Sequence, residues 1–146
     1  MENLEKYLPA VKKIFRQNKV VFALLFGSVA VGKEGKLSDI DFAVFLSEKS
    51  KNIDFFAFRL NLLDQLGKVI KDLPVDVVVL NNSPPLLTQL IIKKGKIIFC
   101  QDENRRVKFF SEVLIKSEEA RFLRGQFYNY LSQRVFKNKF GEKLYG

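Results

Sequence analysis

The sequence predicts an α/β (α+β) fold in which a small mixed β-sheet packs against helices and a long helix follows near the carboxyl end. Two patterns support this. Short apolar runs rich in β-branched and aromatic residues indicate buried strands, and longer segments with apolar residues at every third or fourth position indicate amphipathic helices. The resulting order is helix, strand, strand, helix, strand, helix, strand and long helix, which is typical of a small α/β sandwich.

The first helix is expected to end near residues 17–18, and Pro9 lies near its start or bends it. Its apolar face is formed by Leu4, Leu8, Val11 and Phe15. Val20–Phe26 is an unbroken apolar run, too short for a stable lone helix, and predicts a buried strand. Further strands are predicted at residues 42–46, 75–80 and 96–100, and further helices at residues 53–70, 86–93 and 104 to about 135.

Length and composition predict one domain over residues 1–146, with a core over about 1–100 and a carboxyl-terminal helix and basic tail over about 104–146. No apolar run approaches the length of a membrane span, and the first residues lack a basic segment followed by an apolar one. We therefore expect a soluble, cytoplasmic protein without a membrane partner. Cys100 is the single cysteine and histidine is absent, which excludes an intramolecular disulfide and a Cys/His zinc site.

The formal net charge of +9 is concentrated near the carboxyl end, where residues 104–146 hold 10 Lys and Arg against 4 Asp and Glu. This excess favours either attraction to phosphates or an acidic partner, or else a solvated helix face. No nucleic-acid-binding motif accompanies it, so direct nucleic-acid binding is not expected.

The chemistry is concentrated in one motif, in which Gly27-Ser28 ends the first strand and Asp39-Ile-Asp41 follows after ten residues. Two carboxylates on one side of an extended chain repel unless a cation lies between them, and such hard oxygen ligands suit Mg²⁺. A phosphate could approach the backbone N–H of Gly27, and the Ser28 hydroxyl could add a hydrogen bond. The alternative is a Gly-Ser turn followed by a solvated, Asp-rich turn.

Asp76 is the lone charged residue inside the apolar run of residues 75–80. An ionised carboxylate there is costly unless it is paired or binds a metal. Periodicity alone does not decide where this side chain points. The simpler alternative to a metal ligand is an ion pair with a lysine at the edge of the sheet.

The motif resembles the signature of the polymerase-β-type nucleotidyltransferase superfamily, and its flanking residues Leu25-Phe26 and Ser38 resemble the minimal nucleotidyltransferase (MNT) branch. The resemblance extends over residues 1 to about 131. It implies the polymerase-β-like nucleotidyltransferase fold, ATP as substrate and two Mg²⁺ ions. The implied catalytic and metal-binding residues are Asp39, Asp41 and Asp76, and the implied nucleotide-binding residues are Gly27, Ser28 and Ser38.

Members of this branch often pair with a HEPN-domain ribonuclease in HEPN/MNT toxin–antitoxin modules. The resemblance therefore implies a protein adenylyltransferase that modifies a tyrosine of the toxin and so acts as antitoxin. Two alternatives stay open: a non-catalytic antitoxin that neutralises its partner by binding, and a small-molecule nucleotidyltransferase. Val29 and Val31 occupy two positions where the family often has arginine, which removes cations that could steady the triphosphate. The sequence leaves the acceptor and the choice of nucleotide open.

The predicted carboxyl-terminal helix carries more aromatic residues than one face can bury. This surplus indicates either a protein interface, since aromatic residues and arginine are enriched in interfaces, or an ordinary docking helix. Self-association through this helix is a further expectation. The residues concerned are Phe109, Phe122, Tyr128 and Tyr130, beside Arg121, Arg124 and Arg134.

Overall fold

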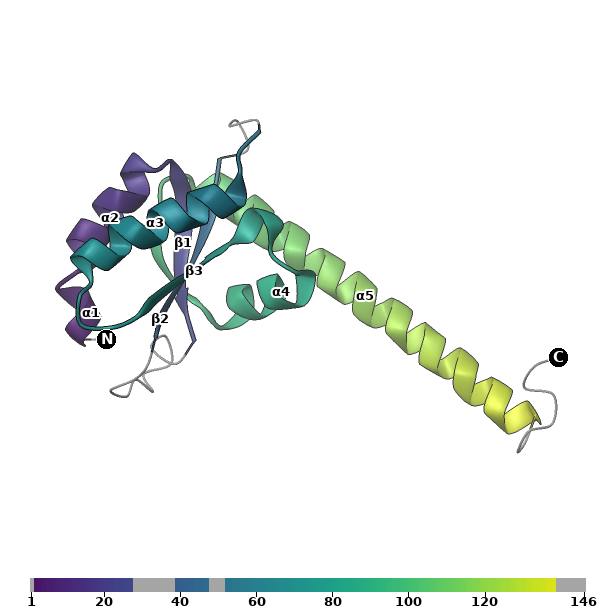
Figure 1. Cartoon of the computed structure of the whole chain (residues 1–146). Coiled ribbons are helices and arrows are strands. Elements are labelled where there is room, and N and C mark those ends of the chain that lie inside the picture. The colour runs from purple at the N-terminus through teal and green to yellow at the C-terminus, as the bar shows by residue number, and fades with distance from the viewer. Residues whose placement is uncertain (1, 28–38, 48–51, 139–146) are drawn as a thin grey trace. The chain divides into compact units, whose positions relative to one another are not determined.

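The computed structural model describes residues 2–27, 39–47 and 52–138, and the elements found there confirm the predicted fold class and element order (Figure 1). The helices are α1 Glu2–Glu5, α2 Leu8–Gln17, α3 Phe55–Val69, α4 Pro85–Lys94 and α5 Glu103–Asn138. The strands are β1 Val20–Phe26, β2 Ile40–Leu46, β3 Val75–Val79 and β4 Lys96–Cys100. A 3₁₀ turn, Leu80–Asn82, follows β3.

The four strands form one mixed sheet in the order β3-β2-β1-β4. Strand β1 pairs antiparallel with both β2 and β4, whereas β3 pairs parallel with β2. A parallel pair needs a crossover connection, and helix α3 provides it between β2 and β3. As a result, the start of β2, the start of β3 and the end of β1 lie at the same end of the sheet.

One face of the sheet is covered by α1, α2 and α3 (Figure 1). Phe15 of α2 meets Phe42 of β2 edge to face, with ring centroids 5.5 Å apart, and both rings are fully buried. Leu62 and Leu66 of α3 are buried in the same cluster. Each such side chain stabilises the fold by about 1.5–3 kcal/mol through its removal from water.

The opposite face packs against α4 and the first turns of α5. Phe22 of β1 and Phe45 of β2 stack with ring centroids 5.0 Å apart. Phe109 of α5 lies against both rings, and Ile91 of α4 is buried in the same cluster. Alternate side chains of β2 and β3 therefore enter two apolar layers, one on each face of the sheet.

Several boundaries differ slightly from the sequence prediction, and two of the differences change the local structure. The expected single amino-terminal helix is interrupted at Lys6 and Tyr7, and Pro9 lies in the first turn of α2, where its missing N–H has no helical partner to lose. Strand β2 begins at Ile40 instead of residue 42, because Asp41 is paired on both sides within the sheet. The carboxylate of Asp41 is therefore presented by a strand and not by a turn.

Side-chain contacts join elements at both ends of the sheet. The Asn81 side chain accepts a hydrogen bond from the Leu46 N–H (2.9 Å) and donates one to the Leu46 carbonyl (3.0 Å), which links the end of β2 to the chain just after β3. At the other end of the sheet, the Tyr7 hydroxyl donates to Asp72 Oδ2 (2.5 Å), and Lys6 Nζ lies 3.1 Å from the same oxygen. Lys6 and Tyr7, which separate α1 from α2, are thus bound to Asp72 in the turn before β3.

The chain divides into two compact units, residues 1–110 and 111–146. In the second unit, helix α5 continues to Asn138 and most described side chains are exposed, among them Leu123 (65%) and Phe127 (61%). None of the helices in the described ranges is long and apolar enough to cross a membrane. The interpretation of residues 1–146 as one domain stays a prediction, and residues 139–146 of the expected basic tail lie outside the described part.

Candidate functional site

Gly27 and Asp41 are in close contact where β1 ends. Gly27 follows the last residue of β1 and has a φ of +80°, a conformation that favours glycine. A Cβ atom added there would lie 2.4 Å from Asp41 Oδ2. Because any larger residue would collide with this carboxylate, the glycine gives Asp41 room at the end of the strand.

Asp41 and Asp76 are direct neighbours across the parallel pair of β2 and β3. In-register partners in a sheet project their side chains to the same face. That face also carries Ala43, Phe45 and Val78, which belong to the layer packed against α4 and α5. The sheet therefore brings together two carboxylates that are 35 positions apart in the sequence.

The electrostatics agree with this closeness. Partial burial, the charge of Asp76 and the charge of Asp39 together raise the pKa of Asp41 above its usual value. Asp39 is exposed and lies just before β2. Each of these carboxylates disfavours the ionised form of Asp41, so the site concentrates negative charge.

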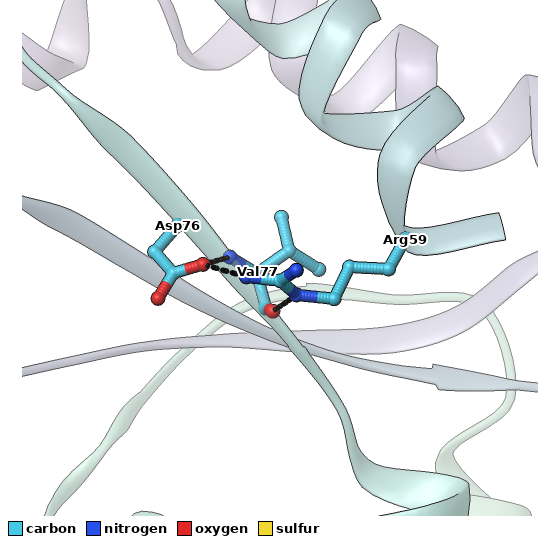
Figure 2. A network of polar contacts seen from close by, with 3 residues as sticks. All are labelled: Arg59, Asp76 and Val77. Carbon is cyan, nitrogen blue, oxygen red and sulfur yellow. Dashed lines mark hydrogen bonds and ion pairs between the residues drawn. The ribbon is translucent and has the colours of Figure 1, made fainter. Parts of the chain in front are cut away.

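Asp76 also contacts Arg59 of helix α3 at the edge of the sheet (Figure 2). Arg59 of α3 donates from Nη2 to Asp76 Oδ1 at 2.5 Å and from Nε to the Val77 carbonyl at 2.7 Å. The Val77 N–H donates to the same Oδ1 at 2.8 Å. The alternative considered from the sequence was an ion pair of Asp76 with a lysine at the sheet edge, and the structure shows an ion pair with Arg59 of α3 instead.

The residues present fit a divalent cation in their chemistry. Their donors are carboxylate oxygens, and a cation would offset the burial and the repulsion between carboxylates that together raise the pKa of Asp41. Within residues 2–27, 39–47 and 52–138, however, no three His, Cys, Asp or Glu side chains are gathered closely enough to hold a metal ion. Asp41 and Asp76 are two neighbouring candidate ligands, and Asp39 is a third carboxylate close to Asp41.

Residues 10–104 match the family model described as polymerase beta, nucleotidyltransferase. The chain belongs to this nucleotidyltransferase family. The matched segment contains the Gly27–Asp41 motif and Asp76, and it ends at the beginning of α5.

This nucleotidyltransferase is 30% identical over 104 residues to protein adenylyltransferase MntA of Aphanizomenon flos-aquae (strain 2012/KM1/D3), a match covering 67% of this chain and 69% of that protein. Its fold is similar to a crystal structure of a toxin–antitoxin with AMP-PNP, with a TM-score of 0.67 and 23% identity over 86% of this chain and 98% of that one. A complex of tri-AMPylated Shewanella oneidensis HEPN toxin with MNT antitoxin gives a TM-score of 0.61 and 21% identity over 88% and 98% of the chains.

The structure brings together three of the residues predicted for the nucleotidyltransferase site. Gly27 contacts Asp41, and Asp41 neighbours Asp76. Asp39 is near enough for its charge to act on Asp41. The predicted nucleotide-binding residues Ser28 and Ser38 lie outside the described residues, as do Val29 and Val31.

Sequence reasoning missed Arg59. A signal was present, because Arg59 and Lys68 are the only cations in α3 and Arg59 stands in its apolar amino-terminal half. Its target could not be read from the sequence, since 17 positions separate it from Asp76. Only the packing of α3 beside β3 shows that Arg59 reaches the carboxylate.

A pocket of about 510 Å³ lies at the opposite end of β1 from Gly27. It contains none of the predicted site residues, so we do not assign the nucleotidyltransferase reaction to this pocket. The pocket is lined by Arg16, Lys19, Val20, Val21, Ser47, Gln101 and Asp102.

Proposed function

We propose that this protein is a Mg²⁺-dependent protein adenylyltransferase that transfers AMP from ATP to a tyrosine hydroxyl of a HEPN-type ribonuclease toxin and thereby acts as antitoxin. The observation that carries the proposal is the in-register pairing of Asp41 with Asp76, with Gly27 against Asp41. The 30% identity to protein adenylyltransferase MntA supports the choice of reaction. The activity is placed in the cytoplasm, where ATP is available.

In this proposal, Gly27, Ser28 and Ser38 hold the triphosphate, and the carboxylates of Asp39, Asp41 and Asp76 orient the reacting groups. The acceptor hydroxyl oxygen forms a bond to the α-phosphorus, and the bond from that phosphorus to the oxygen bridging the β-phosphate breaks. Pyrophosphate leaves, and the hydroxyl proton passes to a carboxylate of the site. Asp76 is our choice for the carboxylate that helps to remove this proton, because Arg59 and the Val77 N–H bind Oδ1 and Oδ2 is turned away from Arg59 (Figure 2).

Mg²⁺ would be held by Asp39, Asp41 and Asp76, as two ions. When bound, it would neutralise charge on the triphosphate and lower the pKa of the acceptor hydroxyl. Two features of the chain support carboxylates in this role. Histidine is absent from the sequence, and the repulsion felt by Asp41 would be relieved by a cation.

The second candidate is an antitoxin that neutralises its toxin chiefly by binding. The exposed apolar and aromatic side chains of the second unit favour it, because side chains of this kind gain most from being covered by a partner. They are Leu114, Ile115, Phe122, Leu123, Phe127, Tyr128, Tyr130 and Leu131. Val29 and Val31 in place of the family's frequent arginines point the same way.

The test is a transfer assay with ATP labelled at the α-phosphate, Mg²⁺ and the HEPN-type toxin encoded beside this protein. We expect label on a tyrosine of the toxin, and we expect it to disappear with Asp39→Ala/Asp41→Ala. Asp64→Ala is a matched control, because Asp64 is an exposed carboxylate on α3 paired with Lys68, and it should leave transfer unchanged.

The two candidates are separated by toxin neutralisation. If the Asp39→Ala/Asp41→Ala protein still silences the ribonuclease while transferring no label, binding is the antitoxin mechanism. If the unaltered protein transfers no label to the toxin, or if transfer survives the double substitution, the adenylyltransferase proposal is wrong.

A further inference from the structure

Arg59 donates hydrogen bonds to two consecutive residues of β3 (Figure 2). One guanidinium nitrogen contacts the Asp76 carboxylate and another contacts the Val77 carbonyl. Strand β3 is an edge strand of the described sheet, so one side of its backbone has no neighbouring strand. The Val77 N–H and carbonyl, which face away from β2, are satisfied by the Asp76 side chain and by Arg59.

We propose that Arg59 is a positioning residue for Asp76, and this inference rests on the proposed function. Arg59 and the Val77 N–H both bind Oδ1 and so fix the torsion of the carboxylate. The second oxygen, Oδ2, points away from Arg59 (Figure 2). Asp76 is thereby held in one orientation with a single oxygen presented to the site.

An ion pair with Arg59 and a role as metal ligand are therefore compatible. A carboxylate that binds a metal through one oxygen is commonly fixed by a hydrogen bond to the other, and loss of such a partner costs about 10–100-fold in metal affinity or activity. Among the described residues Asp41 has no comparable arginine partner, and its carboxylate occupies the space that a side chain at Gly27 would fill. The two neighbouring carboxylates therefore have different surroundings: Asp76 is held by hydrogen bonds, and Asp41 lies against a glycine.

The arginine side chain matters for its shape as well as its charge. Nε and Nη2 are donors in a rigid planar group, and they reach two acceptors on neighbouring residues. Lysine carries one nitrogen on a flexible stem and cannot reproduce this fork. Because the two side chains are 36% and 49% exposed, the ion pair is expected to add little to stability, and its main effect is geometric.

The experiment measures metal binding directly, with Mn²⁺ alone as the probe and free Mn²⁺ followed by electron paramagnetic resonance. We expect Arg59→Gln to weaken Mn²⁺ binding by about 10–100-fold and Arg59→Lys to restore little of the loss. Lys68→Gln is the control, since it removes another cation of α3 from an exposed ion pair with Asp64 and should not change binding.

A second readout separates positioning from a general structural defect. In the transfer assay, Arg59→Lys should raise the Mg²⁺ concentration for half-maximal rate while leaving the KM for the toxin unchanged. Circular dichroism melting identifies any variant that fails to fold. Should Arg59→Gln be unfolded, the folded lysine variant decides the matter.

The outcomes also distinguish this inference from the proposed function. If the unaltered protein binds Mn²⁺ and both Arg59 variants bind it equally well or more tightly, Arg59 does not position Asp76 and the inference is overturned. If the unaltered protein binds no Mn²⁺ at millimolar concentration, the metal site of the proposed function is wrong, and the role of Arg59 falls with it.

Discussion

Replacing Gly27 with alanine would place a Cβ atom 2.4 Å from Asp41 Oδ2 and 3.4 Å from Asp41 Cγ. The first distance is far below any real contact between carbon and oxygen, so the carboxylate must move. The backbone adds a second difficulty, because the φ of +80° at this position is unfavourable for a residue with a side chain. The substitution therefore disturbs the site by one atom without removing any charge.

The cost follows from these two terms. A non-glycine residue in the left-handed region loses about 1–2 kcal/mol. Turning the Asp41 carboxylate out of its preferred rotamer costs about 0.5–1.5 kcal/mol. Together they predict a loss of roughly 1.5–3.5 kcal/mol in the free energy of unfolding. At about 2–4 °C for each kcal/mol in a chain of this size, the Tm should fall by on the order of 3–14 °C.

The assay is thermal and urea unfolding of the metal-free protein, combined with Mn²⁺ titration of the folded state. Gly67→Ala is the matched control, because Gly67 lies inside α3 and an added Cβ would meet nothing within 4 Å. Alanine is the better helix former, so this control should gain about 0.5–1 kcal/mol and bind metal normally. If Gly27→Ala has the same Tm as the unaltered protein and binds Mn²⁺ equally well, the position of Asp41 does not depend on the missing side chain at residue 27.

Three further predictions concern stability. Asp41→Asn should abolish metal binding but stabilise the metal-free fold near neutral pH. The pKa of Asp41 is raised in the folded state, so the stability that this carboxyl contributes is full below its usual pKa of 3.8 and is lost as pH rises through the folded pKa. Asn81→Ala should cost about 1–3 kcal/mol in urea unfolding, because the Leu46 backbone loses both partners. Tyr7→Phe should reduce stability above pH 3.8, because the Tyr7 hydroxyl, ahead of Lys6, lowers the pKa of Asp72; the difference from the unaltered protein should vanish as pH falls through the folded pKa of Asp72.

Each of these has a control and a contrary result. Asp64→Asn should change neither stability nor metal binding, and a metal-free Asp41→Asn protein that is less stable at every pH would contradict the charge argument. Asn82→Ala, at an exposed neighbour of Asn81, should be nearly neutral, and equal losses for both would show that the Leu46 contacts contribute little. For Tyr7→Phe, a stability difference that persists unchanged below the folded pKa of Asp72 would mean that the hydroxyl does not act through that carboxylate.

The sheet could be predicted largely because its strands are apolar runs that stand out from the polar segments around them. Val20–Phe26 was predicted with the bounds that the structure shows. The start of β2 was not, because aspartate disfavours a strand locally, and what places Asp41 in β2 is its pairing with Phe26 and Asp76. Such pairing depends on residues distant in the sequence and leaves no local signature.

The candidate site was predictable in its residue types and less so in its contacts. A lone carboxylate in an apolar run marked Asp76 as unusual, but the alternation of side chains could not say what it would meet. Its bond to Arg59 depends on how α3 crosses from β2 to β3, and the contact of Gly27 with Asp41 depends on a backbone torsion. Both are properties of packing in three dimensions.

The in-register pairing of Asp41 with Asp76 makes the site unequally tolerant of changes in chain length. Insertions or deletions in the connection between α3 and β3 can be absorbed before Val75 without altering which residues face each other. A shift of β3 by one residue against β2, in contrast, would place a valine opposite Asp41 and turn Asp76 to the other face of the sheet. Natural and engineered variants of this chain should therefore differ in the length of that connection while keeping β3 free of insertions and deletions.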